Sequence, residues 1–285
     1  MIRWLLPALA AMTAADAHAL QASDDRGVAV SLARPAARIV TLAPHLAEIA
    51  YAAGVGAKLV GVSTFSRRPP EAERLPMVAS AGRVDIERLI ALRPDLVLAW
   101  QSGNPPLQIE RLERIGMRVF ATEVHALSDI PRIVRAVGVL GGSAGLAERS
   151  AGDFEREITR LRERYAAKPR VAVLVEVWHQ PMLTVSGAHL ISDALAVCGG
   201  RNVFAAAKTL TPLVSRERVL EAQPRAIVTG AFGSEAPSAW RGFELVPAVR
   251  GHRIYSIDPD SLYAQGPHVL EGVRALCQRL DQARD

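Results

Sequence analysis

The sequence predicts an α/β fold in which two similar lobes with mainly parallel sheets are joined by a single long rigid α-helix, with a ligand cleft between the lobes. Two observations support this prediction. Apolar β-prone runs alternate with helical patterns along the chain, which is the order that produces parallel sheets. In addition, one short pattern occurs in both halves, on either side of a highly charged segment.

The charged segment, residues 143–168, is the expected connecting helix. One narrow stripe of residues recurs in it at steps of three or four: Leu146, Ser150, Phe154, Ile158, Leu161 and Tyr165. Ser143 is a suitable N-cap and Lys168-Pro169 a suitable stop. At 1.5 Å per residue the helix is roughly 33 Å long. Because so narrow a stripe covers little core, we expect the helix to lie on the outside of the molecule and to join the two lobes. An ordinary surface helix is the alternative.

The repeated pattern is a capped helix followed by a proline and a strand. It reads DIERLIALRPDLVLAW from Asp85 and SRERVLEAQPRAIVTG from Ser215. A second pair, HLAEIAYAAGVG from His45 and HLISDALAVCGG from His189, follows an apolar run and ends in glycine. Both pairs are expected of two related lobes, although two copies do not make a repeat array.

The first lobe is predicted over residues 34–142. Its expected strands are Arg38–Ala43, Lys58–Val62, Asp95–Ala99 and Met117–Ala121. Its expected helices are Leu46–Ala53, Ile86–Leu92, Leu107–Ile115 and Ile130–Leu140.

The second lobe is predicted over residues 169–285. Its expected strands are Val171–Val177, Met182–Val185, Ala226–Thr229 and Arg253–Ile257, and its helices are Leu190–Val197, Arg216–Ala222 and Val269–Leu280. Ligands of parallel sheets collect at the carboxyl ends of the strands, which can face each other across a cleft in a two-lobed protein.

The N-terminus, residues 1–19, has the pattern of a secretory signal peptide. Arg3 precedes an apolar centre, and Ala17-His18-Ala19 is a small-x-small cleavage site. The apolar run is too short to span a bilayer, and no later stretch approaches twenty apolar residues. We therefore expect a soluble exported protein in which residues 20–33 form a loose leader.

Composition and cysteine usage fit this interpretation. The chain has 285 residues, 49% of them hydrophobic, and a net charge of +5 that comes from arginines spread among acids. Without a concentrated basic face, nucleic-acid binding is disfavoured. Cys198 and Cys277 are the only cysteines, and in an exported chain such a pair predicts a disulfide. Two buried free thiols are the alternative.

Catalytic patterns are absent from the sequence. It contains no G-x-S-x-G elbow, P-loop or G-x-G-x-x-G, and its seven histidines form no HExxH or HxH site. We therefore predict a protein that is not an enzyme and that has no cofactor and no metal site. An exported α/β hydrolase or metal enzyme is the rival of another class.

Strand ends carry aromatic residues instead: Phe65, Trp100, Trp178, Phe232 and Tyr263. Such rings suit the stacking of a flat ligand between lobes, although Trp100 is equally compatible with a core position. Glu87 and Glu217 occupy matching first-turn positions, where the helix dipole favours a carboxylate. They also suit docking to paired arginines of a partner.

Several stretches carry a resemblance to a known family: RIVTLAPHLAEIAYAAG, LVGVSTFSRRPPEAERLP, IERLIALRPDLVLAW, VCGGRNVF, PLVSRERVLEAQPRAIV and the ending from Pro267 to Cys277. From Arg38 to Gln278 the chain resembles the periplasmic binding proteins of ABC importers for cobalamin, haem and iron–siderophore complexes, most of all the cobalamin-binding members. The resemblance implies a monomeric periplasmic receptor that captures a corrinoid, cobalamin above all, and delivers it to an ABC permease.

The resemblance also implies roles for individual residues. Glu87 and Glu217 match glutamates that dock onto permease arginines, and Cys198 and Cys277 match a disulfide. Matches to ligand-contacting positions are Phe65, Trp100 and Asp260. Ala81, Thr211 and Ala264 depart from the family's Trp, Trp and Arg, and Trp178 and Tyr263 are candidates to replace the lost surface.

Other cargoes of the same fold remain open. Haem would require a ligand to its iron, with Tyr263 or His45 as candidates. An anionic siderophore would require arginines that converge in the cleft, and the sequence alone does not place Arg67, Arg68 or Arg83 there.

Overall fold

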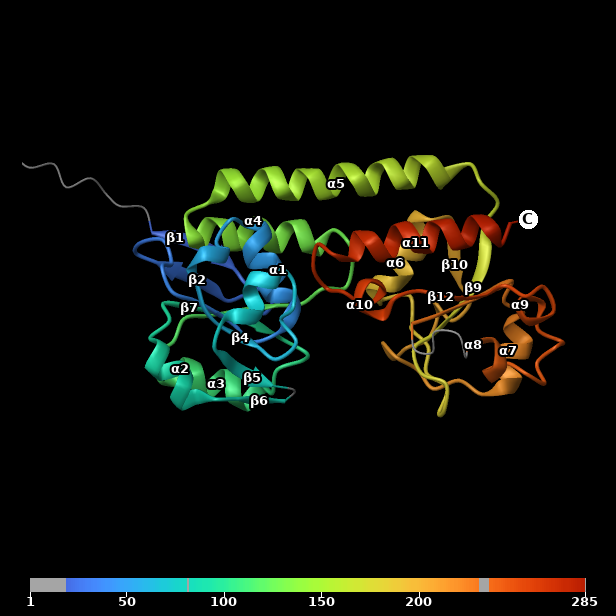
Figure 1. The fold of residues 1–285 in the computed structure, drawn as a ribbon, viewed down its shortest axis with the longest axis horizontal. Coiled ribbons are helices and arrows are strands. Elements are labelled where there is room, and N and C mark those ends of the chain that lie inside the picture. Colours follow the sequence, from blue (N-terminus) through green and yellow to red (C-terminus); the bar gives the residue numbers. More distant parts are fainter. Residues whose placement is uncertain (1–18, 81, 231–235, 285) are drawn as a thin grey trace, which may run out of the picture.

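A computed structural model describes residues 19–80, 82–230 and 236–284. Figure 1 shows two α/β lobes side by side, with the long helix α5 (Ala144–Ala166) running along one face of the molecule and reaching over both. The predicted fold class is confirmed. The predicted signal peptide lies outside the described residues apart from Ala19, as do Ala81 and Phe232.

The first lobe contains a six-stranded sheet in the order β6-β5-β4-β3-β7-β8. Its strands are parallel except for the antiparallel pair β5–β6. All three residues of the central strand β3 are buried, as expected of a parallel strand covered on both faces. The strands are β3 (Ile39–Thr41), β4 (Leu59–Ser63), β5 (Met77–Ser80), β6 (Arg83–Val84), β7 (Leu96–Trp100) and β8 (Val119–Thr122).

The α-helices of the first lobe are α1 (Pro44–Ala52), α2 (Ile86–Leu92), α3 (Pro106–Arg114) and α4 (Asp129–Gly141). Two short 3₁₀ helices accompany them: η1 (Gly56–Lys58) lies between α1 and β4, and η2 (Pro70–Arg74) lies between β4 and β5. The β5–β6 hairpin is not among the elements that the sequence predicted.

The second lobe contains a four-stranded, fully parallel sheet in the order β10-β9-β11-β12. Its strands are β9 (Val171–Glu176), β10 (Gly200–Asn202), β11 (Ala226–Thr229) and β12 (Ile254–Ser256). Its helices are α6 (Leu190–Val197), α7 (Arg216–Ala222), α8 (Ala236–Ala239), α9 (Pro247–Arg250), α10 (Pro259–Leu262) and α11 (Val269–Gln282).

The predicted strand Met182–Val185 is wrong. Leu183 makes only isolated bridges, to Trp178 and Leu213. The backbone hydrogen bonds of this segment go to loop segments instead of a sheet strand: the Leu183 N–H donates to the Trp178 carbonyl and the Thr184 N–H to the Pro212 carbonyl.

The two copies of the repeated pattern adopt the same local structure. The Asp85 carboxylate accepts the backbone N–H of Arg88 at the start of α2, and the Ser215 hydroxyl accepts that of Arg218 at the start of α7. Both helices end in a left-handed residue with φ of 45°, Arg93 in α2 and Gln223 in α7. In each copy the following strand enters its sheet directly.

Helix α5 packs closely on α4, because small residues face each other at their contact. A Cβ atom at Gly138 of α4 would lie 2.2 Å from the Cβ of Ala147. The buried face of α5 is Ala147, Ala151, Phe154, Ile158, Leu161 and Tyr165. The predicted stripe is therefore right from Phe154 onward and wrong at its start, where Leu146 is half exposed.

Direct contacts tie the two lobes together beside α5. The backbone N–H of Leu127, before α4, donates to the Asp193 carboxylate of α6 at 2.8 Å. The backbone N–H of His268, at the start of α11, donates to the Glu48 carboxylate of α1 at 3.3 Å. These contacts and the length of α5 fix the spacing of the lobes in this structure.

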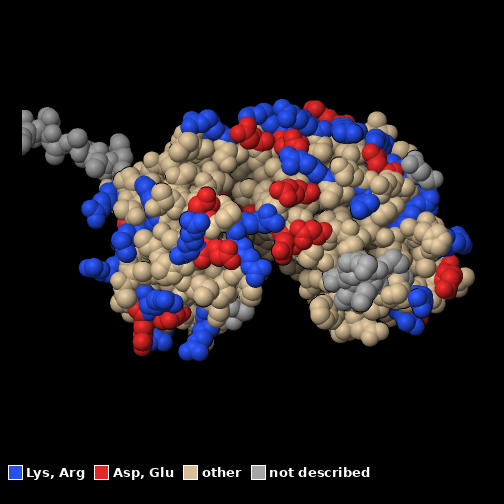
Figure 2. All heavy atoms as spheres, in the orientation of Figure 1, with Lys and Arg blue, Asp and Glu red and all other residues tan. Residues whose placement is uncertain are grey.

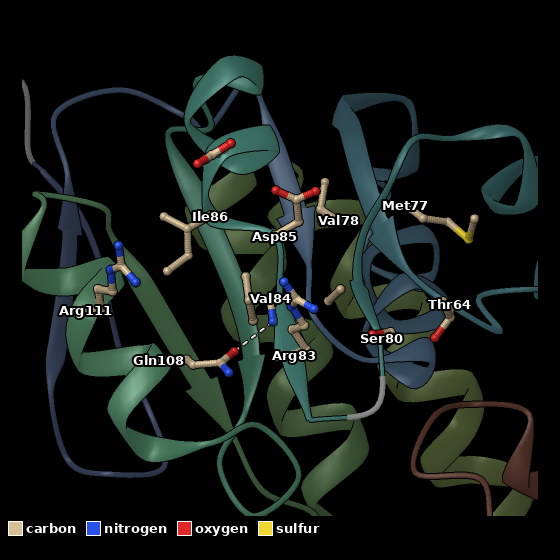
Figure 3. A pocket seen from close by; sticks show the side chains of 12 residues that line it. Thr64, Met77, Val78, Ser80, Arg83, Val84, Asp85, Ile86, Gln108 and Arg111 are labelled. Carbon is tan, nitrogen blue, oxygen red and sulfur yellow. Dashed lines mark hydrogen bonds between the residues drawn. The ribbon is translucent and has the colours of Figure 1, made fainter.

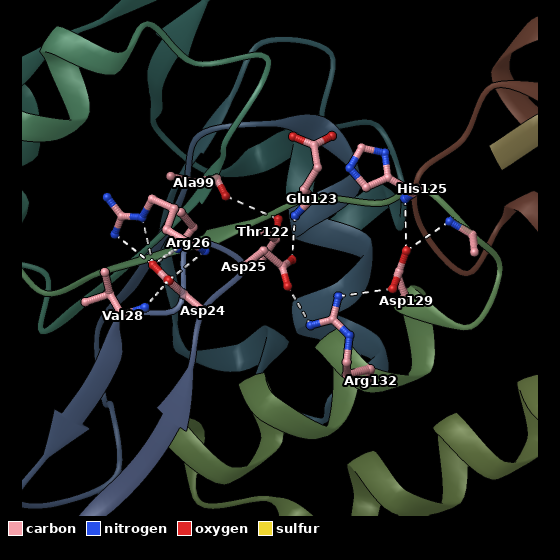
Figure 4. A network of polar contacts seen from close by, with 12 residues as sticks. Asp24, Asp25, Arg26, Val28, Ala99, Thr122, Glu123, His125, Asp129 and Arg132 are labelled. Carbon is pink, nitrogen blue, oxygen red and sulfur yellow. Dashed lines mark hydrogen bonds and ion pairs between the residues drawn. The ribbon is translucent and has the colours of Figure 1, made fainter. Parts of the chain in front are cut away.

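Residues 20–33 are an ordered hairpin rather than the expected loose leader. Strands β1 (Leu20–Ser23) and β2 (Ala29–Leu32) pair antiparallel, and Val30 and Leu32 are buried. The Asp24 carboxylate in the turn accepts the backbone N–H of Val28 at 2.9 Å. Figure 4 shows this turn connected through Asp25 and Arg132 to β8 and α4. The hairpin therefore belongs to the first lobe.

Two further predictions concern the cysteines and membrane spans. Cys198, at the end of α6, and Cys277, in α11, form the predicted disulfide, which joins two helices of the second lobe. Among the residues that the structure describes, no helix is both long enough and apolar enough to cross a membrane.

Candidate ligand-binding cleft

A cleft of about 460 Å³ lies between the lobes and is lined by both of them. Figure 2 shows the molecule hollowed where the lobes face each other, with basic and acidic side chains on the two sides. The first lobe contributes Pro44, His45, Glu48, Phe65, Arg67, Arg68 and Trp100. The second contributes Pro259, Asp260, Tyr263, Ala264 and Gln265. Four of the five predicted ligand-binding residues thus line one cleft.

Phe65 is presented to solvent by a constrained backbone. It follows β4 with a φ of 63°, and its side chain is 70% exposed. A bulky residue in the left-handed region costs of order 1–3 kcal/mol and is found most often at functional sites. An exposed aromatic ring held at this cost is a strong candidate for a ligand contact.

Trp100 ends β7 and is oriented by several contacts. Its indole N–H donates to the Glu123 carboxylate at 3.3 Å, and its backbone N–H donates to the Asn104 side-chain oxygen at 2.7 Å. A Cβ at Gly103 would lie 1.8 Å from a ring carbon of Trp100, so the loop passes directly beside the ring. Trp100 is only partly buried and lines the cleft, which decides between the cleft and core alternatives.

His45 lies edge-on to Trp100, with ring centroids 5.4 Å apart. Burial lowers the pKa of His45 to about 3, so the imidazole is neutral at ordinary pH. Its Nε2 atom is buried without a hydrogen-bond partner, as is the Oε1 atom of Gln265 on the opposite wall. His45 therefore supports the floor of the cleft, with its Nε2 atom covered.

Glu48 is the largely buried acid of the cleft. Burial raises its pKa to about 7, against the opposing effects of the His268 N–H and the nearby Arg68 guanidinium. Its position on α1 was expected, but its place between the lobes was not. A single acid within the apolar run HLAEIAYA was the sequence signal that could have identified it.

The second lobe contributes Tyr263 and Asp260. The Tyr263 hydroxyl accepts the backbone N–H of Gly230 at 3.2 Å and lies 3.3 Å from the carbonyl oxygen of Glu176, to which it can donate. Burial raises the pKa of this phenol to about 12. Asp260, at the start of α10, is exposed and borders the cleft.

Three predicted residues lie elsewhere. Trp178 follows β9, is 51% exposed and donates its indole N–H to the carbonyl of Gln180, but it is not among the residues that line the cleft. Glu87 and Glu217 are exposed on α2 and α7, at the ends of the two lobes that lie away from α5 (Figure 1).

A larger hollow of about 680 Å³ adjoins Glu87 on the first lobe alone (Figure 3). Its lining is polar and includes Arg83, Asp85 and Arg111. Because only one lobe lines it, lobe movement does not close it, and the inter-lobe cleft is the better ligand site. Within the described ranges, no group of three or more His, Cys, Asp or Glu could hold a metal ion.

A two-lobed α/β fold with a connecting helix and an aromatic-lined cleft defines a ligand-binding protein. The chain belongs to the periplasmic binding protein family, whose model matches residues 39–261. It is 34% identical over 251 residues to the vitamin B12-binding protein of Vibrio cholerae, covering 88% of this chain and 91% of the relative.

Solved structures agree with the fold. The crystal structure of the periplasmic vitamin B12 binding protein BtuF of Vibrio cholerae matches with a TM-score of 0.80 and 33% identity, covering 88% of this chain and 99% of that one. The periplasmic heme-binding protein RhuT from Roseiflexus sp. RS-1 matches with a TM-score of 0.75 and 26% identity, over 87% and 99% of the two chains.

Proposed function

We propose that this protein works in the periplasm. There it captures a corrinoid, cobalamin in particular, in the cleft between its lobes and delivers it to the permease of an ABC importer. No bond of the ligand is made or broken. The observation that carries the proposal is the cleft itself, in which exposed Phe65 and ordered Trp100 offer flat apolar surface within a fold shared with vitamin B12-binding relatives.

The size of the cleft bears on how the ligand is held. Pockets for drug-sized ligands measure roughly 300–1,000 Å³, and this cleft is near the lower end of that range. A corrinoid is larger than such ligands, so part of it stays exposed while the ring system occupies the cleft. Because α5 and the direct contacts hold the lobes apart, we expect a largely preformed site and a small movement on binding.

Titration with cyanocobalamin tests the proposal. Saturable binding by calorimetry or by tryptophan quenching is expected, and Phe65→Ala should weaken it. Leu107→Ala is the matched control, because Leu107 is also a large exposed hydrophobic residue of the first lobe but is not part of the cleft lining. If wild-type protein shows neither heat nor quenching, the corrinoid proposal fails.

Haem is the second candidate, because heme-binding proteins share the fold. Neither of the iron ligands suggested by the sequence is well placed for it. The Tyr263 hydroxyl is already engaged with the Gly230 N–H, and its raised pKa disfavours the phenolate that would bind ferric iron. The His45 Nε2 atom is buried. A haem titration followed by absorption spectroscopy would reveal iron ligation if this assessment were wrong.

Delivery is assigned to Glu87 and Glu217. Both carboxylates are exposed in the first turn of matching helices, one on each lobe, on the face away from α5. Because α2 and α7 both lie at the lobe ends away from α5 (Figure 1), a partner that spans the two lobes there can meet both carboxylates. Arginines of the permease are the proposed counterparts, since charge pairs at an exposed interface fix orientation.

A further inference from the structure

Two arginines of the cleft are not explained by the stacking of a flat ring. Arg67 and Arg68 follow Phe65 on the loop after β4, and both side chains are exposed and line the cleft. The Arg67 guanidinium lies 5.6 Å from the centre of the Phe65 ring. A cationic edge therefore adjoins the aromatic surface.

The charges around these arginines do not balance. In the part of the chain that the structure describes, neither guanidinium is paired with an acid in a salt bridge, although Arg68 lies near enough to Glu48 to oppose the rise of its pKa. The acids of the cleft lining are Glu48 and Asp260, and Asp260 projects from the other lobe. Burial raises the pKa of Glu48 to about 7, which weakens its ability to compensate a neighbouring cation. The lining of the cleft thus carries an excess of positive charge.

An excess of positive charge affects which ligands bind well. A ligand that covers the cleft removes water from the guanidinium groups, and this is unfavourable unless the ligand supplies an acceptor of opposite charge. Guanidinium groups match phosphate and carboxylate in geometry and can bind them through paired hydrogen bonds.

We propose that Arg67 and Arg68 bind an anionic group at the edge of the ligand, and that this group is the phosphate on the side arm of a corrinoid. The inference depends on the proposed function and extends it, because it defines which corrinoids are preferred. With the corrin ring against Phe65 and Trp100, the flexible phosphate-bearing arm reaches the neighbouring arginines. Corrinoids that carry this phosphate are preferred over those that lack it.

Cobinamide and cobinamide phosphate provide the sharpest comparison, because they share one ring and differ by the phosphate. Wild-type protein should bind cobinamide phosphate roughly 10 to 100 times more tightly, the range expected for hydrogen bonds to charged groups. Added sodium chloride should reduce this ratio, since exposed charges are screened.

The variant that tests the assignment is Arg67→Gln with Arg68→Gln, for which the affinity ratio should fall toward one. The control is Arg93→Gln with Arg118→Gln, which removes the same charge shortly before β7 and β8, at the opposite ends of these strands from the cleft. The control should keep the wild-type ratio. Both arginines of the tested pair are exposed, and the single variants replace the double one if it does not fold.

The outcomes separate the two proposals. Tight binding of both cobinamides with a ratio near one, or a ratio unchanged in the Arg67/Arg68 variant, overturns this inference and leaves the proposed function standing. Binding of neither cobinamide overturns this inference, and the cyanocobalamin titration then decides separately whether the proposed function stands. Hemin and its dimethyl ester form a second comparison. If the protein binds hemin more tightly than the ester, loses this preference in the Arg67/Arg68 variant and binds neither cobinamide nor cyanocobalamin, the arginines serve propionates and both proposals are overturned.

Discussion

Individual residues of the cleft show how its surface is prepared for a ligand. Phe65 has a left-handed backbone and an exposed ring, and Gly103 lets a loop lie beside the Trp100 ring. Neither feature increases the apolar area buried within the protein. Their shared effect is to hold two aromatic rings in place before the ligand arrives, which reduces the ordering cost of binding.

Gly103→Ala should weaken ligand capture by about tenfold, which corresponds to a loss of about 1.4 kcal/mol of stacking. The new Cβ would lie 1.8 Å from a Trp100 ring carbon, so the indole must turn away. Cobalamin titration measures the effect, and Gln101→Ala on the same loop is the control. Wild-type affinity in Gly103→Ala would contradict the role of the Trp100 orientation.

Glu48 should make the stability of the unliganded protein depend on pH. Its folded-state pKa of about 7 exceeds the ordinary value of 4.5, so its stabilising contribution is fully present below pH 4.5 and is lost as pH rises through about 7. Above about pH 7 the free energy of unfolding should be lower by about 3 kcal/mol than below pH 4.5.

Denaturant unfolding of wild type and Glu48→Gln across this pH range measures the effect. Glu48→Gln should remove most of the pH dependence of the free energy of unfolding. Its stability relative to wild type should therefore increase as pH rises. Exposed Glu163→Gln on α5 is the control for general charge effects. Parallel pH profiles for wild type and Glu48→Gln would exclude this role for the buried carboxyl.

At the scale of elements, local signals predicted most helices well. Asp85 and Ser215 cap α2 and α7, and both helices and β11 have the predicted bounds. The errors arise where pairing decides the structure. The short strands β6 and β10 each pair with one neighbour at an edge of their sheet, and Met182–Val185 hydrogen-bonds to loop segments instead of joining a sheet.

The contact between α4 and α5 depends on Gly138. Gly138→Ala would place its Cβ 2.2 Å from that of Ala147, and overpacking of this kind costs roughly 1–3 kcal/mol, more than the helix propensity gained. Thermal or denaturant unfolding should therefore show a destabilised protein.

Gly145→Ala in the exposed first turn of α5 is the matched control, because only the tip of an arginine side chain approaches that site. It should stabilise the protein by up to about 1 kcal/mol. Ala147→Gly in combination with Gly138→Ala should restore part of the lost stability. A Gly138→Ala protein as stable as wild type would show that the helices separate without cost.

At the scale of the whole molecule, α5 and the direct lobe contacts separate two tasks. The cleft between the lobes holds the ligand, whereas Glu87 and Glu217 stand on exposed lobe ends. Capture and delivery therefore depend on different residues and should respond separately to substitution.

Glu87→Lys combined with Glu217→Lys should leave cobalamin affinity within about twofold of wild type and abolish stimulation of transport by a reconstituted permease. Reversed charges would face the proposed arginines and repel them. Asp153→Lys with Glu163→Lys on α5 gives the same change in net charge on another face and should transport normally. Unaltered transport by the Glu87/Glu217 variant would refute the docking role.

The sequence by itself determined the alternation of strands and helices, the two matching capped units, the connecting helix and the aromatic residues at strand ends, because each depends on neighbours a few positions apart. It did not determine that Glu48, Arg67 and Arg68 meet Asp260 and Tyr263 in one cleft, that Trp178 lies outside the lining, or that Ala147 rather than Leu146 is buried. Only the tertiary structure decided these points. They depend on which strand edges remain free, how closely two helices approach, and where the lobes meet, and each of these involves residues far apart in the chain.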